Sequence, residues 1–282
     1  MKLVAYSLPD ENEVRRGVVI QEENREDYVI EVPGDFRALG KNDLALLEQN
    51  LNTYLQSAVK LDTVTLHAPV PNPGKILCVG LNYADHVAEF NLTLPDHPVL
   101  FAKFNNTLAG HGGAILVDGT SQAVDYEAEL AFVIGKQAYK VTEETALDYV
   151  AGYVTANDVT ARDIQHADSQ WVRGKSLDSF CPLGPWLITK DEVPDPHNLT
   201  IRCRVNGVIL QDSNTNQLIF KIPFLVSFLS QGLTLEPGDV ILTGTPSGIG
   251  YARKPQILLK PGDIVEIEIE KVGVLESTVK ER

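Results

Sequence analysis

Short apolar runs rich in β-branched residues alternate with turn residues along most of the chain, and this pattern predicts a fold dominated by strands. Two stretches instead repeat apolar residues at three- and four-residue spacing and predict helices, at residues 43–59 and 222–232. Asn206-Gly207 has the sequence of a tight hairpin turn. The clearest predicted strands cover residues 75–80, 124–134, 153–156, 199–205, 208–211, 240–243 and 264–269. The sequence therefore predicts a β-rich fold of the α+β class.

The first 70 residues form a unit of their own in this pattern. The predicted helix 43–59 is preceded by strand-like runs at 2–7, 17–21 and 28–32. Three prolines and a glycine follow within residues 69–74, which is typical of a connector between domains. We therefore predict a small α+β accessory domain at residues 1–70 and a larger domain, carrying the chemistry, at residues 71–282.

The predicted strand 124–134 carries two glutamates, Glu127 and Glu129, ahead of a continuous apolar run. Alternate side chains of a strand share a face, so these carboxylates point the same way and repel each other unless a cation lies between them. Mg²⁺, Mn²⁺ and Ca²⁺ prefer such oxygen ligands. Asp158 directly follows another predicted strand and is placed to complete a metal site. The alternative is that the two glutamates are a solvated pair on an edge strand.

A second set of polar residues has the chemistry of an enzyme active site. His86 and Glu89 are three residues apart on a predicted helix, so the carboxylate can orient the imidazole as a general base. Lys175 lies between glycine and serine in a predicted loop and is a candidate for stabilising an oxyanion. Arg162 and Gln165 can bind the carboxylate and the carbonyl of a substrate. The plainer alternative for the His86–Glu89 pair is a surface contact on a short helix.

The net charge and the composition limit the kinds of partner that we expect the protein to bind. The net charge of −14 argues against a nucleic acid or an anionic membrane, but it does not exclude a small anion bound in a pocket. The three cysteines are widely spaced and match neither a disulfide framework nor a zinc site. The chain shows no charged and apolar leader and no apolar run long enough to span a membrane. We therefore expect a cytoplasmic protein with no nucleic-acid and no membrane partner.

Five segments, taken together and in this order, resemble the fumarylacetoacetate hydrolase (FAH) family. The resemblance covers roughly residues 73–278, and it is carried by Asn82-Tyr83 with His86 and Glu89, Asp125 to Leu130, Asn157 to Asp163, Gly174 to Asp178, and Leu242 to Gly250. None of these segments would be specific alone. The resemblance implies a FAH-type mixed β-roll for the catalytic domain, preceded by the small N-terminal domain of bacterial two-domain relatives.

The resemblance also implies roles for single residues. The implied ligands of a Mg²⁺ or Mn²⁺ ion, for which Ca²⁺ is a possible substitute, are Glu127, Glu129 and Asp158. The implied catalytic residues are His86, Glu89 and Lys175. The implied substrate-binding residues are Arg162, Gln165 and Thr245. The relatives are usually homodimers, so the resemblance also implies a homodimer that takes a small anionic oxo-acid substrate.

The expected activity is hydrolysis of a carbon–carbon bond in a 2,4-dioxo acid, such as an acylpyruvate or a fumarylpyruvate-like compound, to a 2-oxo acid and a carboxylic acid. Relatives that keep the His–Glu pair hydrolyse or decarboxylate, which favours this activity. The same scaffold also serves isomerases and decarboxylases of 2-hydroxyhepta-2,4-diene-1,7-dioate type, oxaloacetate decarboxylases and ureidoglycolate lyases. A binding module without catalysis is a different class of protein. It would not need a His–Glu pair, three carboxylates and a lysine together.

Overall fold

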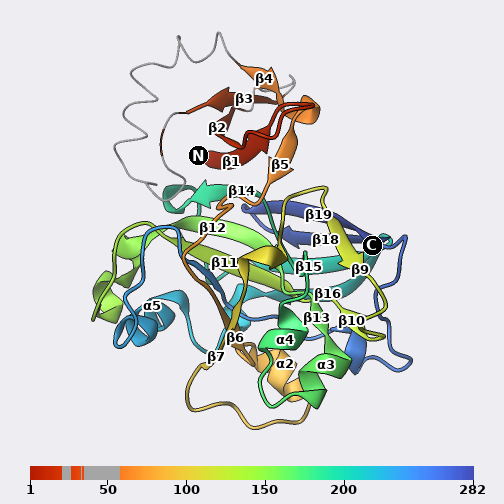
Figure 1. Ribbon diagram of the computed structural model, residues 1–282. Helices are drawn as coiled ribbons and strands as arrows, with labels where there is room; N and C mark the ends of the chain where they lie inside the picture. Colours follow the sequence, from red (N-terminus) through yellow and green to blue (C-terminus); the bar gives the residue numbers. More distant parts are fainter. Residues whose placement is uncertain (21–26, 33, 35–57) are drawn as a thin grey trace.

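The computed structural model describes residues 1–20, 27–32, 34 and 58–282. Strands dominate this part of the chain (Figure 1), and the predicted β-rich α+β class is confirmed. Most of the predicted helix 43–59 lies outside the described residues, and its last residue, Val59, belongs to a short strand. No helix in the described ranges is long and apolar enough to cross a membrane.

The largest sheet combines strands from both ends of the chain. Its first strands are β1 (Lys2–Ser7), β2 (Arg15–Ile20), β3 (Tyr28–Glu31), β4 (Val59–Lys60) and β5 (Thr65–His67). The others are β6 (Ile76–Gly80), β7 (Val99–Lys103), β8 (Leu108–Ala109), β11 (Ala128–Ile134), β12 (Val150–Asn157), β14 (Cys181–Thr189) and β17 (Val240–Leu242). The order is β4-β3-β2-β1-β14-β12-β11-β17-β6-β7, with β5 beside β1 and β8 beside β14.

A second sheet packs against the first. Its strands are β9 (Ala114–Val117), β15 (Thr200–Val205), β16 (Val208–Asn214), β18 (Ile264–Ile269) and β19 (Gly273–Glu281). They lie in the order β16-β15-β18-β19-β9, and β10 (Val124–Asp125) pairs separately with β13 (Thr160–Ala161). The predicted hairpin is confirmed, because β15 and β16 are antiparallel neighbours and Asn206 and Gly207 both take the positive φ that its turn requires.

Strand β11 is buried on both faces, which explains its continuous apolar run. Leu130 and Phe132 pack in one core cluster with Ile267 of the second sheet. Ala131 and Val133 belong to another cluster on the opposite face of the large sheet. This double burial fixes the strand that carries Glu129.

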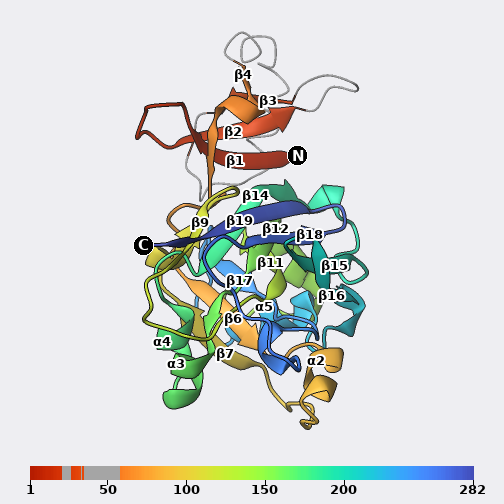
Figure 2. The ribbon, with the colours of Figure 1, turned by 90° about the vertical axis from the view of Figure 1, so that its right-hand side faces the viewer.

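The described part of the chain has four short α-helices, three of which gather at one end of the molecule. The four are α2 (Ala84–Glu89), α3 (Arg162–Ala167), α4 (Val172–Lys175) and α5 (Ile222–Ser230). Figures 1 and 2 both place α2, α3 and α4 at the end opposite the N-terminal strands. The prediction of a loop at Lys175 is wrong, because its backbone N–H donates to the carbonyl of Trp171 and closes a helical turn. Short 3-10 helices cover Leu61–Thr63, Asn105–Thr107, Glu143–Tyr149, Lys190–Glu192, Thr215–Gln217 and Gly250–Ala252.

The N-terminal strands are joined to the rest of the large sheet. Lys2 and Leu3 of β1 are register partners of Ile188 and Leu187 of β14. The division into domains at residue 70 therefore stays a prediction, since backbone pairing crosses it.

Candidate active site and metal centre

The predicted site residues lie at or just beyond the ends of four neighbouring inner strands, all on the same side of the large sheet's strand ends. Strand β11 begins where the antiparallel β12 ends, and Ala128 is the register partner of Asn157. On its other side β11 pairs with β17, which runs parallel to β6. Asp158 directly follows β12, and Thr245 follows shortly after the end of β17. Helix α2, which carries His86, follows β6. Residues far apart in sequence therefore meet at the start of β11.

The prediction of one unbroken strand over residues 124–134 is wrong, because the chain divides into β10 and β11. Asp125 Oδ1 accepts a hydrogen bond from the backbone of Tyr126 at 3.0 Å, and Asn157 Oδ1 accepts one from the backbone of Glu127 at 3.0 Å. Side chains thus replace the ladder partners at the break. The edge-strand alternative is also wrong, because β11 lies inside the sheet and Glu127 and Glu129 are buried.

Glu127, Glu129 and Asp158 come together as predicted. Each offers a carboxylate oxygen, and these three oxygens lie within 4.8 Å of one another. All three residues are buried. Three oxygen donors without cysteine or histidine suit a hard divalent cation such as Mg²⁺ or Mn²⁺. The residues present therefore fit the metal that the sequence predicts.

Two of the three carboxylates are held by buried cations. Lys175 Nζ lies 2.8 Å from Glu127 Oε2 and 2.7 Å from Asp158 Oδ2. Arg162 Nη2 lies 2.6 Å from Glu127 Oε1, and Lys103 Nζ lies 2.5 Å from Asp158 Oδ1. Burial alone would raise the pKa of Glu127, but Lys175 and Arg162 outweigh it and lower that pKa to about 2. The side chain of Glu127 is therefore ionised at neutral pH.

Glu129 is in a different position, since it forms no ion pair with any residue that the structure describes. Its Oε2 accepts a hydrogen bond of 2.6 Å from the backbone of Gly244. Burial, and then Asp158 and Glu127, raise the pKa of Glu129 well above its ordinary value. Gly244 takes a φ of +102°, and a Cβ there would lie 3.0 Å from the carbonyl oxygen of Val79, so the turn needs glycine.

The formal charges of the site nearly balance. Four buried carboxylates, those of the three ligand candidates and Asp125, face the three cationic side chains of Lys103, Arg162 and Lys175. One negative charge is left over, and it belongs with Glu129, which has no cationic partner. A divalent cation would reverse the sign of the site and would leave it attractive to an anion.

The predicted contact between His86 and Glu89 is also formed. His86 Nδ1 lies 3.2 Å from Glu89 Oε2, and Glu89 Oε1 accepts a hydrogen bond of 2.9 Å from the backbone of Gly248. The ring of Phe90 meets the imidazole edge to face, with 5.3 Å between the ring centroids. The surface-pair alternative holds only for Glu89, which is exposed, because His86 is buried. With Nδ1 held by the carboxylate, Nε2 is the nitrogen left to act as a base.

These groups line one cavity of about 200 Å³. Seven of the predicted site residues contribute to its wall, namely His86, Glu127, Glu129, Arg162, Gln165, Lys175 and Thr245. The remaining two do not line the cavity. Glu89 is exposed and bonds to His86, and Asp158 is buried and bonds to Lys175. Two ring pairs complete the wall, Phe101 with Trp171 at 5.5 Å and His166 with Tyr251 at 5.1 Å between centroids.

Arg162 lies in the cavity wall, but its guanidinium binds protein groups. Nε donates to Asp125 Oδ2 at 2.9 Å, and Nη1 donates to Gln165 Oε1 at 3.1 Å. Because Oε1 of Gln165 is taken, the amide nitrogen of Gln165 is left to donate to a ligand. The contact predicted between Arg162 and a substrate carboxylate stays a prediction.

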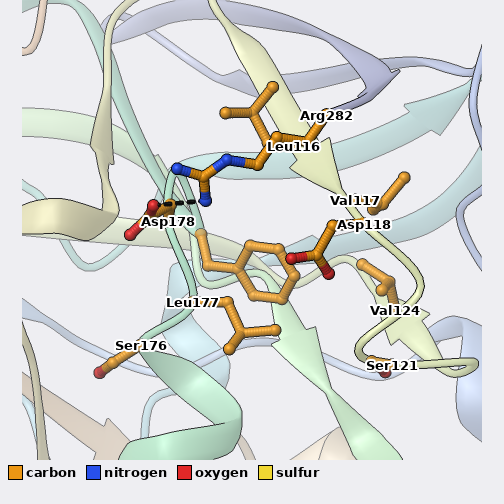
Figure 3. A pocket seen from close by; sticks show the side chains of 10 residues that line it. Leu116, Val117, Asp118, Ser121, Val124, Ser176, Leu177, Asp178 and Arg282 are labelled. Atoms are coloured by element: carbon orange, nitrogen blue, oxygen red, sulfur yellow. Dashed lines mark hydrogen bonds and ion pairs between the residues drawn. The ribbon is translucent and has the colours of Figure 1, made fainter.

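A second cavity, of about 190 Å³, contains none of the predicted site residues. Figure 3 shows Arg282 paired with Asp178 on one side of it and Asp118 on another. Its wall includes Ser176 and Leu177, which follow Lys175 directly in the chain. Nothing in this cavity points to a ligand.

Sequence reasoning gave no role to Lys103 or Asp125. Lys103 lies between Ala102 and Phe104, and a lysine among apolar residues is the signal that was available. Asp125 Oδ1 also accepts a hydrogen bond from the backbone of Gly250, so it ties Arg162 to the turn that carries Tyr251.

We predict that Lys103→Met lowers the free energy of unfolding by about 3–5 kcal/mol, because it leaves one oxygen of the buried Asp158 without its cation. Denaturant unfolding of the metal-free protein measures this change. Lys136→Met is the matched control, since Lys136 is exposed and should cost less than about 0.5 kcal/mol. Equal effects of the two changes would contradict the structural role of Lys103.

The fold and this arrangement are those of an enzyme whose acidic site can hold a divalent metal. Residues 75–280 match the family described as "Fumarylacetoacetate (FAA) hydrolase C-terminal". The chain belongs to the fumarylacetoacetate hydrolase family, as its motifs predicted.

Three relatives illustrate the range within that family. "Oxaloacetate tautomerase fahd2, mitochondrial" of Xenopus laevis is 44% identical over 288 residues, which cover 99% of this chain and 90% of the relative. "Oxaloacetate tautomerase FAHD2A, mitochondrial" of Homo sapiens is 50% identical over 214 residues, covering 75% of this chain and 68% of the relative. The crystal structure of a 5-carboxymethyl-2-hydroxymuconate delta-isomerase from Mycobacterium smegmatis is similar over 100% of both chains, with 35% identity and a TM-score of 0.83.

Proposed function

We propose that the protein is a divalent-metal-dependent tautomerase that interconverts the keto and enol forms of a 2-oxo dicarboxylic acid, with oxaloacetate as its substrate. The observation that carries this proposal is the shared cavity, whose wall includes His86 together with Glu127 and Glu129 of the buried carboxylate triad. Two curated relatives named as oxaloacetate tautomerases, and a similar structure named as an isomerase, support it. The proposal replaces C–C hydrolysis as the first candidate.

Tautomerisation needs a group that moves a proton and groups that stabilise negative charge on oxygen. His86 Nε2 would move the proton at the carbon next to the 2-oxo group, with Glu89 holding the opposite ring nitrogen. The ammonium of Lys175 would stabilise charge on the substrate oxygen. A divalent cation on Glu127, Glu129 and Asp158 would supply Lewis-acid polarisation of the 2-oxo group.

The charge of the site agrees with an anionic substrate. The cavity wall offers the amide nitrogen of Gln165 and the hydroxyl of Thr245 beside the ammonium of Lys175. Donors of this kind suit carboxylate oxygens. A net charge of −14 over the whole chain does not oppose this, because a divalent cation would make the local charge of the pocket positive.

The test is the decay of enol oxaloacetate, followed by its ultraviolet absorbance, with protein and Mg²⁺ or Mn²⁺ against a blank that contains the metal alone. We expect the wild-type protein to accelerate keto–enol interconversion at least tenfold over this blank. Chelation of the metal should remove the acceleration. A rate equal to the metal blank at micromolar protein would overturn the proposal.

Hydrolysis of acylpyruvates remains the second candidate, because an imidazole held by a carboxylate is equally suited to activate water. Release of pyruvate, measured with a coupled enzyme, separates the candidates. A tautomerase releases none from either substrate, a decarboxylase releases pyruvate from oxaloacetate, and a hydrolase releases it from an acylpyruvate. The homodimer and the cytoplasmic location expected from the sequence stay predictions, as does the absence of nucleic-acid and membrane partners.

A further inference from the structure

Gln211 of β16 is a buried side chain that binds two parts of the active site at once. Its Oε1 accepts a hydrogen bond of 2.9 Å from the backbone of Ala128, which lies between Glu127 and Glu129. Its Nε2 donates to Thr245 Oγ and to the carbonyl of Pro246, each at 2.9 Å. Gln211 is 1% exposed.

The surroundings allow this amide only one orientation. A backbone N–H can only donate and a backbone carbonyl can only accept, so exchanging Oε1 and Nε2 would set donor against donor at Ala128 and acceptor against acceptor at Pro246. Both hydrogens of Nε2 are used, one on Pro246 and one on Thr245. The hydrogen bond between Gln211 and Thr245 therefore runs from amide to hydroxyl.

This direction decides what Thr245 offers to the cavity. Its oxygen accepts from Gln211, and its own hydrogen has no acceptor in the part of the chain that the structure describes. Thr245 lines the same cavity as Glu129 and Lys175. The hydroxyl must direct its hydrogen away from Gln211, so it faces the cavity as a donor.

We propose that Gln211 is a positioning residue that fixes the Thr245 hydroxyl as a donor and thereby selects an oxyanion, the carboxylate of the oxo acid, at that point of the cavity. Because the same amide holds Ala128, it also sets this donor at a constant distance from the metal ligands on either side. The inference rests on the proposed function only for the kind of ligand, a 2-oxo acid anion.

Gln211→Glu tests the direction of the hydrogen bond, because it keeps the shape of the side chain and replaces the donor by an acceptor. The Thr245 hydroxyl then donates to residue 211 and turns a lone pair to the ligand. With the Mn²⁺-loaded protein, we expect the Kd for pyruvate, a stable 2-oxo acid, to rise by roughly 10–100-fold, measured by calorimetry. KM for oxaloacetate should rise in parallel, with kcat changed less than about threefold. Gln217→Glu, the same change on an exposed residue, should leave both values unchanged.

A double-mutant cycle separates positioning from general damage. Thr245→Val should raise the Kd for pyruvate by itself, and Gln211→Glu in the Thr245→Val background should add less than about threefold. A purely structural role would give the full Gln211→Glu effect in both backgrounds and would overturn the inference. If Gln211→Glu does not fold, Gln211→Met removes the donor without adding charge and should give a smaller rise that also vanishes in Thr245→Val.

The outcome is independent of the proposed activity. A wild-type protein that binds pyruvate with Mn²⁺ but does not accelerate oxaloacetate tautomerisation would end the proposed function and leave this inference standing. An unchanged Kd for pyruvate in both Gln211→Glu and Gln211→Met would overturn the inference and leave the proposed function untouched.

Discussion

Glu129→Gln should weaken metal binding and lower activity strongly while making the metal-free protein more stable. Glu129 is the buried ligand candidate without a cationic partner, and burial raises its pKa. Removing its charge therefore removes a penalty from the metal-free fold. Loss of a direct ligand should weaken Mn²⁺ binding by roughly 100-fold or more and lower kcat by roughly 10³-fold. Calorimetric Mn²⁺ titration and thermal melting in excess chelator measure the two effects.

The pH dependence gives this prediction a second readout. A carboxyl group whose pKa is raised in the folded state costs stability as the pH rises above its ordinary value of 4.5 towards the raised pKa. In chelator, the melting temperature of Glu129→Gln should therefore exceed that of the wild type by an amount that grows with pH above 4.5 and then levels off. A variant that melts lower at neutral pH would show that the ionised carboxylate is needed by the metal-free fold.

Glu127→Ala is the instructive contrast. If Glu127 were a metal ligand and nothing more, this change would leave the metal-free fold intact. In the structure Glu127 holds both Lys175 and Arg162, so its removal leaves two buried cations short of a partner. We therefore expect Glu127→Ala to lose both metal affinity and stability, unlike Glu129→Gln.

The strands and the cluster of three carboxylates could be predicted because their signals are local. The apolar run of β11 and the Asn206-Gly207 turn each determine their own conformation. Glu127, Glu129 and Asp158 were found because carboxylates beside strand ends are visible in the sequence. The break between β10 and β11 was not, since it depends on Asn157, a side chain from another strand that takes the place of a ladder partner.

The cations and amides that hold the site could not be predicted for the same reason. Lys103 is 55 residues from Asp158 along the chain, and Gln211 is 83 residues from Ala128. Neither has a local motif, and each acquires its role only when the sheets bring it to a buried polar group. Arg162 shows the converse, since its residue type suggested a substrate contact while its neighbours in space, Asp125 and Glu127, are both anionic.

His86→Ala should lower kcat by roughly 10²–10⁴-fold, the usual worth of a positioned general base. Its imidazole lines the cavity but is not one of the three ligand candidates, so the Kd for Mn²⁺ should stay within about twofold of the wild type. Glu89→Gln should cost less, because it keeps a side chain that can accept from Nδ1 while removing the charge that raises the basicity of the ring. Steady-state kinetics with oxaloacetate, together with Mn²⁺ titration, measures both variants.

Measuring His86→Ala with both oxaloacetate and an acylpyruvate distinguishes tautomerisation from hydrolysis. In a tautomerase, His86→Ala removes the proton-moving group and reduces interconversion itself. If His86→Ala keeps full tautomerase activity but loses pyruvate release from an acylpyruvate, the imidazole activates water, and hydrolysis is the reaction that this pair serves. If His86→Ala loses Mn²⁺, the imidazole is a ligand and the three-carboxylate site is wrong. Glu143→Gln, on an exposed residue that does not line the cavity, should change none of these values and controls for preparation.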